Sequence, residues 1–151
     1  MALYVKNICA IEGIDSRGYP TVICKTTMSD GAVGIASVPS GASTGKFEAH
    51  ELRDCDNCFG GKGVKKAVEN VNSVIAPEIV ALQSACQKKI DDKMIALDSS
   101  ENKSTLGANA ILWFCMKHPD AYCAEALNQK FVGGVLMETA TFTTKPHATL
   151  E

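Results

Sequence analysis

A change of periodicity near residue 62 constrains the fold of this chain more than any other sequence feature. Before it, segments rich in β-branched and aromatic residues predict strands at residues 3–14, 20–28 and 32–38. The last two are separated by Ser29-Asp-Gly31, a hairpin turn signal. Strands followed by helices are typical of an α+β layer and not of alternating β-α units. We therefore expect an α+β fold, a three-stranded antiparallel β-meander followed by a helical bundle.

Four helices are expected after the change. The first carries an apolar face at helical spacing, formed by Val64, Ala67, Val68, Val71, Val74 and Ile75. A second short helix is predicted from Pro77 to about Leu82, because the first turn of a helix does not need the N–H that proline lacks. The third, marked by Ile90, Met94 and Leu97, ends near Asp98. The fourth is marked by Leu106, Ala110, Trp113 and Phe114 and is stopped by Pro119.

Composition and charge exclude several functional classes. The chain has 151 residues, of which 46% are hydrophobic and 21% charged, as in ordinary globular proteins. Its net charge is -2, so there is no basic excess to drive nucleic-acid binding. No apolar run approaches the roughly 20 residues that a membrane span needs. The N-terminal residues also lack the pattern of a signal peptide. We expect a cytoplasmic protein with no nucleic-acid partner and no membrane span.

The seven cysteines are odd in number and irregularly spaced, so reduced thiols are expected. Cys9 and Cys24 have apolar neighbours in the sequence and are interpreted as small hydrophobic residues. Cys55-Asp-Asn-Cys58 has zinc-type spacing, but a structural zinc site needs four ligands. The other candidate ligands are only loosely placed: His50, Cys115 and His118. The favoured interpretation is a polar turn that carries two thiols.

A loop of small residues follows the third predicted strand and is the leading candidate site. It consists of Ser40, Gly41, Ala42, Ser43, Thr44 and Gly45. Such a loop can bring carbonyl and hydroxyl oxygens close to a ligand, and Mg²⁺ prefers oxygen ligands. It is not a P-loop, because the Gly-Lys-Ser/Thr ending is missing. By composition alone it is also typical of an ordinary surface loop.

An acidic segment comes next, with Glu48, Glu51 and Asp54. Paired carboxylates can perform acid–base chemistry where their environments separate their pKa values. The alternative, which we favour, is a solvated face whose carboxylates pair with Lys46 and Arg53.

Gly60-Gly-Lys-Gly63 precedes the first predicted helix. It has the composition of a phosphate-binding turn at a helix N-terminus. A flexible entry to the helix is the favoured alternative.

Taken together, five blocks resemble the N-terminal domain of the enolase family over residues 4 to about 112. They are Ile14-Asp-Ser-Arg-Gly-Tyr-Pro-Thr-Val22, Val38-Pro-Ser-Gly-Ala-Ser-Thr-Gly45, Glu51-Leu-Arg-Asp54, Gly61-Lys-Gly-Val64, and Asn102-Lys-Ser to Gly107-Ala-Asn-Ala-Ile-Leu112. All five occur in the order and spacing of that family. The resemblance implies a meander followed by helices, in agreement with the periodicity.

The resemblance also implies a function. In enolases this domain caps a C-terminal β/α barrel that dehydrates 2-phosphoglycerate to phosphoenolpyruvate. It implies that Ser43 ligates a Mg²⁺ through its carbonyl and hydroxyl oxygens, and that Ala42, Thr44 and Gly45 move with it in a loop that closes over the substrate. The barrel supplies the acid–base residues, so no catalytic residue is expected in this chain. Mg²⁺ binding by the isolated chain is expected to be weak or absent, because one serine supplies too few oxygens.

The sequence departs from the family pattern after Leu112, from Trp113 onwards. We therefore expect an enolase-like domain at 1–112 and a divergent tail at 113–151, with one helix and an irregular arm. A barrel takes about 250 residues, and far fewer follow Leu112, so the barrel is expected to lie outside this chain. Ile23 stands where the family has an acidic residue that makes a dimer contact, and His50 where it has an apolar one.

Three functions remain open at this stage. The first is a capping domain that works with an enolase barrel or a full-length enolase subunit and meets 2-phosphoglycerate or phosphoenolpyruvate only in that complex. The second is a non-catalytic binding or regulatory scaffold. The third is a truncated enolase product that associates with full-length enolase.

Overall fold

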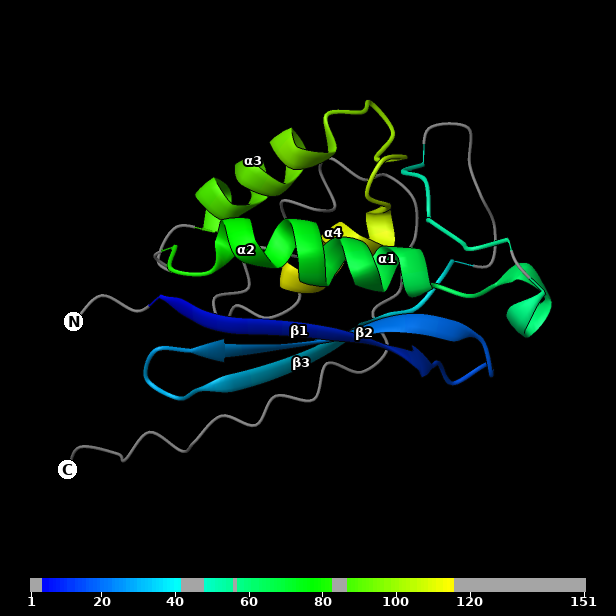
Figure 1. Cartoon of the computed structure of the whole chain (residues 1–151), viewed down its shortest axis with the longest axis horizontal. Helices are drawn as coiled ribbons and strands as arrows, with labels where there is room; N and C mark the ends of the chain where they lie inside the picture. The colour runs from blue at the N-terminus through cyan, green and yellow to red at the C-terminus, as the bar shows by residue number, and fades with distance from the viewer. Residues whose placement is uncertain (1–3, 42–47, 56, 83–86, 116–151) are drawn as a thin grey trace.

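The computed structural model describes residues 4–41, 48–55, 57–82 and 87–115. The predictions made for residues 42–47 and 116–151 lie outside these ranges. Within them, a three-stranded antiparallel sheet is followed by helices that lie on one face of the sheet (Figure 1). The predicted α+β fold class is confirmed.

The sheet is a meander in the order β1-β2-β3. Its strands are β1 (Val5–Ile14), β2 (Pro20–Met28) and β3 (Val33–Val38). These bounds agree with the predicted strands to within two residues, which is the usual uncertainty of an element end. In the register, Ile11 pairs with Ile23, and Ile23 pairs with Ser37 on the next strand.

Alternation along the strands decides which side chains reach the core. Ile8, Ala10 and Cys24 face the helices and are buried, which agrees with the interpretation of Cys24 as a small hydrophobic residue. Cys9 lies between Ile8 and Ala10 on the opposite face and is exposed. The interpretation of Cys9 as a small hydrophobic residue, drawn from its apolar sequence neighbours, is wrong, because successive strand residues point to opposite faces and Cys9 points away from the core.

The first two predicted helices form one continuous helical run. It comprises α1 (Lys65–Glu69), a π-helical segment η2 (Asn70–Ile75) and α2 (Ala76–Ile79). The separate helix expected from Pro77 to Leu82 is therefore wrong. At the end of η2 the Ala76 N–H donates to the Val71 carbonyl, five residues back. This wider turn lets the run pass Pro77, which has no N–H, and the run ends at Ile79.

The remaining elements are η1 (Cys58–Gly61), α3 (Gln87–Asp98) and α4 (Ala108–Cys115). α3 ends where the sequence predicts, and α4 contains Ala110, Trp113 and Phe114 as expected. The predicted division between residues 112 and 113 falls within α4. It stays a prediction, because the chain after residue 115 lies outside the described residues.

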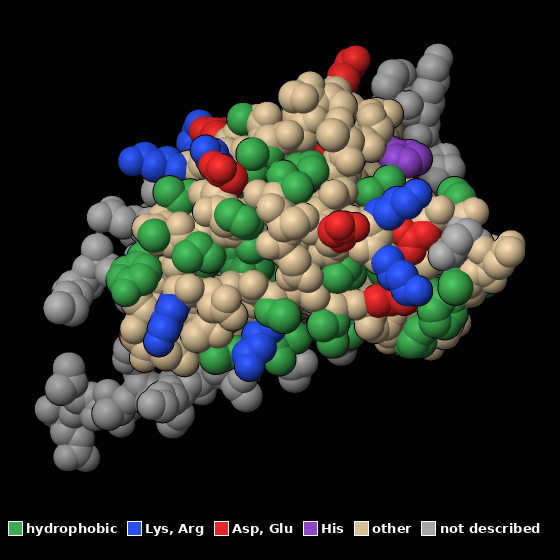
Figure 2. All heavy atoms as spheres, in the orientation of Figure 1, with side chains coloured by type: hydrophobic (Ala, Val, Ile, Leu, Met, Phe, Trp, Pro, Cys, Tyr) green, Lys and Arg blue, Asp and Glu red, His purple; other side chains and the backbone are tan. Residues whose placement is uncertain are grey.

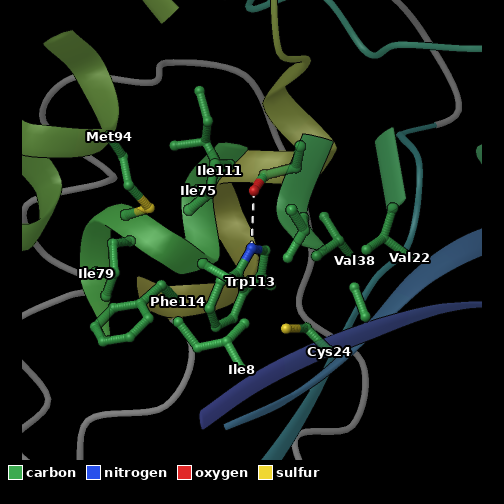
Figure 3. Close-up of a cluster of buried hydrophobic side chains, with 14 of the residues drawn as sticks. Ile8, Val22, Cys24, Val38, Ile75, Ile79, Met94, Ile111, Trp113 and Phe114 are labelled. Atoms are coloured by element: carbon green, nitrogen blue, oxygen red, sulfur yellow. Dashed lines mark hydrogen bonds between the residues drawn. The ribbon is translucent and has the colours of Figure 1, made fainter. Parts of the chain in front are cut away.

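The core lies between the sheet and the helices (Figure 3). Trp113 of α4 is at its centre, and its ring packs edge-on against Phe114 with centroids 5.2 Å apart. The indole N–H donates to the Ala110 carbonyl at 2.8 Å, so the buried polar group of this side chain is satisfied. Ile8, Val22, Cys24 and Val38 from the sheet, and Ile75, Ile79, Met94 and Ile111 from the helices, complete the view. No helix among the described residues is long and apolar enough to cross a membrane.

Candidate functional site

The structure shows how the predicted ligand loop begins. Of its six residues, Ser40 and Gly41 are described, while Ala42, Ser43, Thr44 and Gly45 lie outside the described residues. The Ser40 hydroxyl donates to Glu51 Oε1 at 2.5 Å and accepts from the Arg53 guanidinium. The Ser40 carbonyl accepts from the Arg17 guanidinium. Two arginines from distant parts of the chain therefore hold the start of the loop.

Arg53 joins four segments of the chain. Its Nη1 donates to the carbonyls of Pro20 at 2.7 Å and Lys62 at 2.5 Å, and its Nη2 pairs with Glu51 at 2.8 Å. The side chain is only 17% exposed, and it also reaches Ser40. Charged hydrogen bonds in a partly buried setting are stronger than exposed ones. Arg53 therefore fixes the start of β2, the start of the loop and the approach to α1 relative to one another.

The turn between β1 and β2 positions Arg17. Asp15 Oδ1 accepts from the backbone N–H groups of Arg17 at 2.9 Å and Tyr19 at 2.8 Å. Its Oδ2 lies 3.5 Å from Arg17 Nη2. Desolvation by burial raises the pKa of Asp15, but these N–H donors and the Arg17 charge outweigh it, so the pKa lies below its ordinary value. Asp15 is therefore an ionised structural group that directs Arg17 towards Ser40.

Residues 50–54, here called the strap, have no regular secondary structure but are held along their length. The His50 N–H donates to the Asn102 carbonyl at 2.6 Å, and the His50 carbonyl accepts from Ala108 at 2.8 Å. The buried Asn109 amide accepts from the Leu52 N–H at 3.1 Å and donates to its carbonyl at 3.0 Å. The strap carries Glu51 and Arg53, so these contacts position the two side chains that bind Ser40.

Gly107 brings the strap close to the start of α4. Its φ of +93° belongs to the left-handed region that favours glycine. A Cβ there would lie 2.5 Å from the Cβ of Leu52 and 2.6 Å from Asn109 Oδ1. The Gly107-Ala-Asn109 block thus serves here to accommodate the strap.

Asp54 ends the strap and binds the N-terminus of α1. Its carboxylate accepts from the N–H groups of Lys65 at 2.8 Å and Lys66 at 2.9 Å. The Val64 N–H donates to Glu12 of β1 at 2.7 Å. These three amides are those that a phosphate would use, and carboxylates already occupy them. The structure therefore gives no support to a phosphate-binding turn at Gly60–Gly63, the less favoured of the two sequence interpretations.

The acidic segment is tied into the structure more firmly than the sequence indicated. The expected pairing of this segment with Arg53 is confirmed for Glu51. Lys46 lies outside the described residues, and Glu48 is half-buried. Figure 2 shows basic and acidic side chains intermixed at the end of the molecule where α1 begins. The described carboxylates of this segment therefore form an ion pair and a helix cap. They do not form a pair whose different surroundings would separate their pKa values for acid–base chemistry.

The described residues do not fit a magnesium site. Among the described residues, no group of three or more His, Cys, Asp or Glu side chains is arranged so that it could hold a metal ion. The Ser40 hydroxyl, at the start of the predicted loop, is engaged by Glu51 and Arg53. We therefore derive no chemical step through a metal from these residues.

Sequence reasoning missed two roles. It did not foresee that Asn109 binds both backbone groups of Leu52, or that Asp54 caps a helix eleven residues away. One feature of the sequence could have indicated the Asp54 cap: Gly63 stands two residues before the start of α1. A Cβ at Gly63 would lie 2.6 Å from Asp54 Oδ2, so the cap requires glycine there.

Comparison with known proteins assigns a family to this architecture. Residues 5–131 match the model of the family described as "Enolase, N-terminal domain". The chain is 57% identical over 108 residues to the enolase of Methanopyrus kandleri, covering 72% of this chain and 25% of that protein. It is 49% identical over 142 residues to the enolase of Anaplasma phagocytophilum, covering 88% of this chain and 33% of that protein.

A third relative gives the same picture. The chain is 51% identical over 135 residues to the enolase of Campylobacter jejuni, covering 87% of this chain and 32% of that protein. The chain thus spans a quarter to a third of the length of these curated relatives. The resemblance to the enolase N-terminal domain is confirmed.

Proposed function

Because this chain belongs to the enolase family through its N-terminal domain, we propose that it serves as the capping part of a 2-phosphoglycerate dehydratase. In this proposal, a β/α barrel supplies the acid–base residues. The capping part contributes the loop of Ser40, Gly41, Ala42, Ser43, Thr44 and Gly45, which closes over the substrate. Glycolysis in the cytoplasm is the corresponding biological setting.

The observation that carries the proposal is the set of bonds at the start of the loop. Ser40 binds Glu51 of the strap directly, so the points where the chain enters and leaves residues 41–50 are joined. Arg17 and Arg53 add two bonds to the same serine. A loop that acts on a substrate needs such a rigid frame, because small displacements of catalytic groups are costly.

The Mg²⁺ of the family is part of the proposal at one residue. We assign Ser43 as the chain's contribution to the metal site, with the other oxygen ligands coming from outside the described residues. Near-octahedral Mg²⁺ takes several oxygens. Binding is therefore expected only in the assembled enzyme.

A chimaera tests the proposal. Residues 5–131 of this chain would replace the matching part of Campylobacter jejuni enolase, and phosphoenolpyruvate formation from 2-phosphoglycerate would be followed with Mg²⁺ present. We expect the kcat of the chimaera to lie within about tenfold of that of the parent enzyme, which corresponds to a difference of at most about 1.4 kcal/mol in the activation free energy. A chimaera that melts cooperatively like the parent but has no activity would contradict the proposal.

Single substitutions in the chimaera sharpen the test. Ser43→Ala should lower kcat about 10–100-fold, the range expected when a group that organises a metal is lost. The matched control is Ser73→Ala, an exposed serine of η2 that donates to the Glu69 carbonyl, and it should leave kcat unchanged. Equal rates for the two variants would remove Ser43 from the site.

A second candidate function, a non-catalytic partner of an enolase subunit, is favoured by the face of the sheet that the described helices leave uncovered. Ile11 is 58% exposed and pairs with Ile23 of β2, and Ile35, which is 51% exposed, lies on the same face of β3 opposite Lys25. Exposed apolar groups that adjoin one another mark interaction surfaces. Mixing the chain with intact Campylobacter jejuni enolase tests this function: co-elution that Ile11→Asp abolishes supports it, and separate elution contradicts it.

A further inference from the structure

The two edge strands of the sheet differ in what they contact. β1 forms one edge of the sheet and β3 forms the other (Figure 1). On β1, the Val5 N–H donates to the Leu82 carbonyl at 3.1 Å, and the Ala81 N–H donates to the Val5 carbonyl at 2.8 Å. Further along, the Asn72 amide binds both backbone groups of Ala10, at 2.8 and 2.9 Å. The helical run and the segment after it therefore cover the edge of β1 at both places.

The backbone of β3 directs every second residue away from the sheet. The Met28 N–H donates to the Ala32 carbonyl at 2.8 Å across the turn between β2 and β3. In an antiparallel ladder such bonded pairs recur at every second residue. The even-numbered residues of β3 therefore direct their backbone groups towards β2, and the odd-numbered residues direct theirs outward from the edge. The outward residues are Val33, Ile35 and Ser37.

The sequence of β3 contains none of the features that protect edge strands. Protected edges carry charges, proline or bulges that hinder pairing with a further strand. β1 has a register shift between Val5 and Asn7 and carries the exposed Lys6 there. The six residues of β3 include no charge and no proline, and they pair with β2 without a register shift. Ile35, near the middle of the strand, is 51% exposed. An edge of this kind favours pairing with another strand.

We propose that this edge binds a second copy of the chain, through antiparallel pairing of β3 with β3. A two-fold axis at Ile35 relates the two copies, so that the backbone N–H and C=O groups of Ile35 in each copy bond those of Ile35 in the other. Val33 of each copy then pairs with Ser37 of the other. This register is the symmetric one that uses all three outward residues. The inference goes beyond the proposed dehydratase and does not depend on it.

The charges beside the edge are compatible with a second copy. Lys25 of β2 pairs with Ile35 and is exposed. In the paired copies the two Ile35 side chains stand between the two Lys25 side chains, which places these lysines three strand spacings, or about 14 Å, apart. Exposed charges at that separation are largely screened, because the Debye length is about 8 Å at physiological ionic strength. The two Ile35 side chains meet at the axis and bury apolar surface that each copy exposes.

Sedimentation of the full chain tests the association. One strand of six residues is a small contact, so the dimer should be weak and reversible. The average mass should rise from that of one chain towards that of two as the concentration increases over roughly 1 µM to 1 mM, the range in which weak complexes dissociate. A chain that stays monomeric up to about 1 mM would overturn the proposal. Assembly beyond two copies would also contradict it, because the other edge of each sheet is covered at β1.

Alternate amides of β3 supply an internal control in the unmodified chain. The N–H groups of Val33, Ile35 and Ser37 point outward, whereas those of Gly34 and Ala36 face β2 in a single copy. Amide hydrogen exchange, measured by nuclear magnetic resonance, should slow at the outward residues in proportion to the falling monomer fraction. It should stay slow at Gly34 and Ala36 at every concentration. Outward amides that exchange equally fast at all concentrations would disprove the pairing. Outward amides that are slow at all concentrations would disprove it too, and would identify a segment of the same chain as the occupant of the edge.

Charge substitutions at the axis test the register. Ile35→Lys and Ile35→Glu each place like charges directly opposite one another, so each should weaken the dimer at least about tenfold. An equimolar mixture of the two variants should recover it, because opposite charges then face each other. The matched control is Ile11→Lys, a substitution on β1 at an isoleucine that is 58% exposed, and it should leave the dimer intact.

A dimer of unchanged affinity in Ile35→Lys, or a mixture that associates no better than either variant alone, would overturn the pairing at Ile35. The exchange measurement on the unmodified chain decides the question even if a variant does not fold.

Discussion

The strap and the loop of residues 55–62, here called the dithiol loop because it carries Cys55 and Cys58, adjoin in the chain. Neither has long regular elements, yet they are held in opposite ways. In the strap, backbone bonds and a buried Asn109 amide hold residues along the whole segment. The dithiol loop is closed at its base by the Asp54 N–H, which donates to the Gly63 carbonyl at 2.9 Å, and its described residues Cys55 and 57–60 are exposed. Order in irregular segments thus comes from polar groups contributed by other elements. The strap should be intolerant of change, and the dithiol loop tolerant.

Two glycine substitutions give the largest expected contrast. Gly107→Ala adds a Cβ 2.5 Å from the Leu52 Cβ at a φ of +93°, so strain and overlap combine. We expect a loss of about 3–4 kcal/mol in the free energy of unfolding. Gly60→Ala, at a φ of +62° with open space around it, should cost only about 1 kcal/mol. Urea unfolding of both variants measures the difference.

The interpretation fails if the two variants lose equal stability. That result would mean that the cost at Gly107 is conformational alone and that the close approach to Leu52 contributes nothing.

Asparagine substitutions give the next contrast. Asn109→Ala removes both bonds to Leu52 and leaves a partly buried N–H and carbonyl without that partner. We expect a loss of about 2–3 kcal/mol, since an unsatisfied buried group incurs its full desolvation cost. The exposed Asn57→Ala in the dithiol loop should change stability by less than about 0.5 kcal/mol. Thermal unfolding of the pair, with Asn109→Asp as a shape-matched control, tests this.

The sequence predicted the parts of this fold that depend on periodicity. Strand composition with turn signals located β1, β2 and β3, and apolar residues at helical spacing located α3 and α4, because burial of one helix face imposes that spacing directly. The prediction of a separate helix beginning at Pro77 was wrong. Proline favours the first turn of a helix, but the π-helical segment η2 continues directly into α2, so the run passes Pro77 without a break. The interpretation of Cys9 was wrong because residues next to each other in a strand point to opposite faces of the sheet.

The candidate site was less predictable for a different reason. Its bonds join residues far apart in the chain, such as Ser40 with Arg17, and Leu52 with Asn109. No local pattern encodes such pairs in a single sequence. The composition of the loop identified Ser40 and Gly41 as a candidate segment, and the resemblance to a family ordered the blocks, but the contacts between blocks required the structure.

A smaller effect is expected at the junction of the two regions. Asp54→Ala removes the acceptor for the Lys65 and Lys66 N–H groups, which then depend on water. Loss of a helix cap costs about 1 kcal/mol. Asp54→Asn keeps one oxygen acceptor and should recover part of that stability. Urea unfolding measures both variants, and full stability in the alanine variant would show that Asp54 does not stabilise α1.

The smallest effect is a pH dependence at Asp98, which holds the segment leading to Gly107. This buried carboxylate accepts from the N–H groups of Leu106 at 2.7 Å and Ser100 at 3.1 Å. Burial raises the pKa of Asp98, but the hydrogen bonds from Ser100 and Leu106 and the Lys103 charge outweigh it, so the pKa lies below 3.8. Because desolvation opposes these contributions, only the difference between them stabilises the fold.

A folded-state pKa below the unfolded value means that ionised Asp98 stabilises the fold above pH 3.8, and that this contribution is lost as pH falls through the folded-state pKa. Urea unfolding at a series of pH values should therefore show wild type and Asp98→Asn converging as the pH falls below 3.8. Asp15 also has a lowered pKa, but its contribution is the same in both proteins and cancels in the difference between their unfolding free energies. A constant difference between the two proteins across that range would mean that Asp98 binds its partners equally well when protonated, and that its charge does not help to order the approach to the strap.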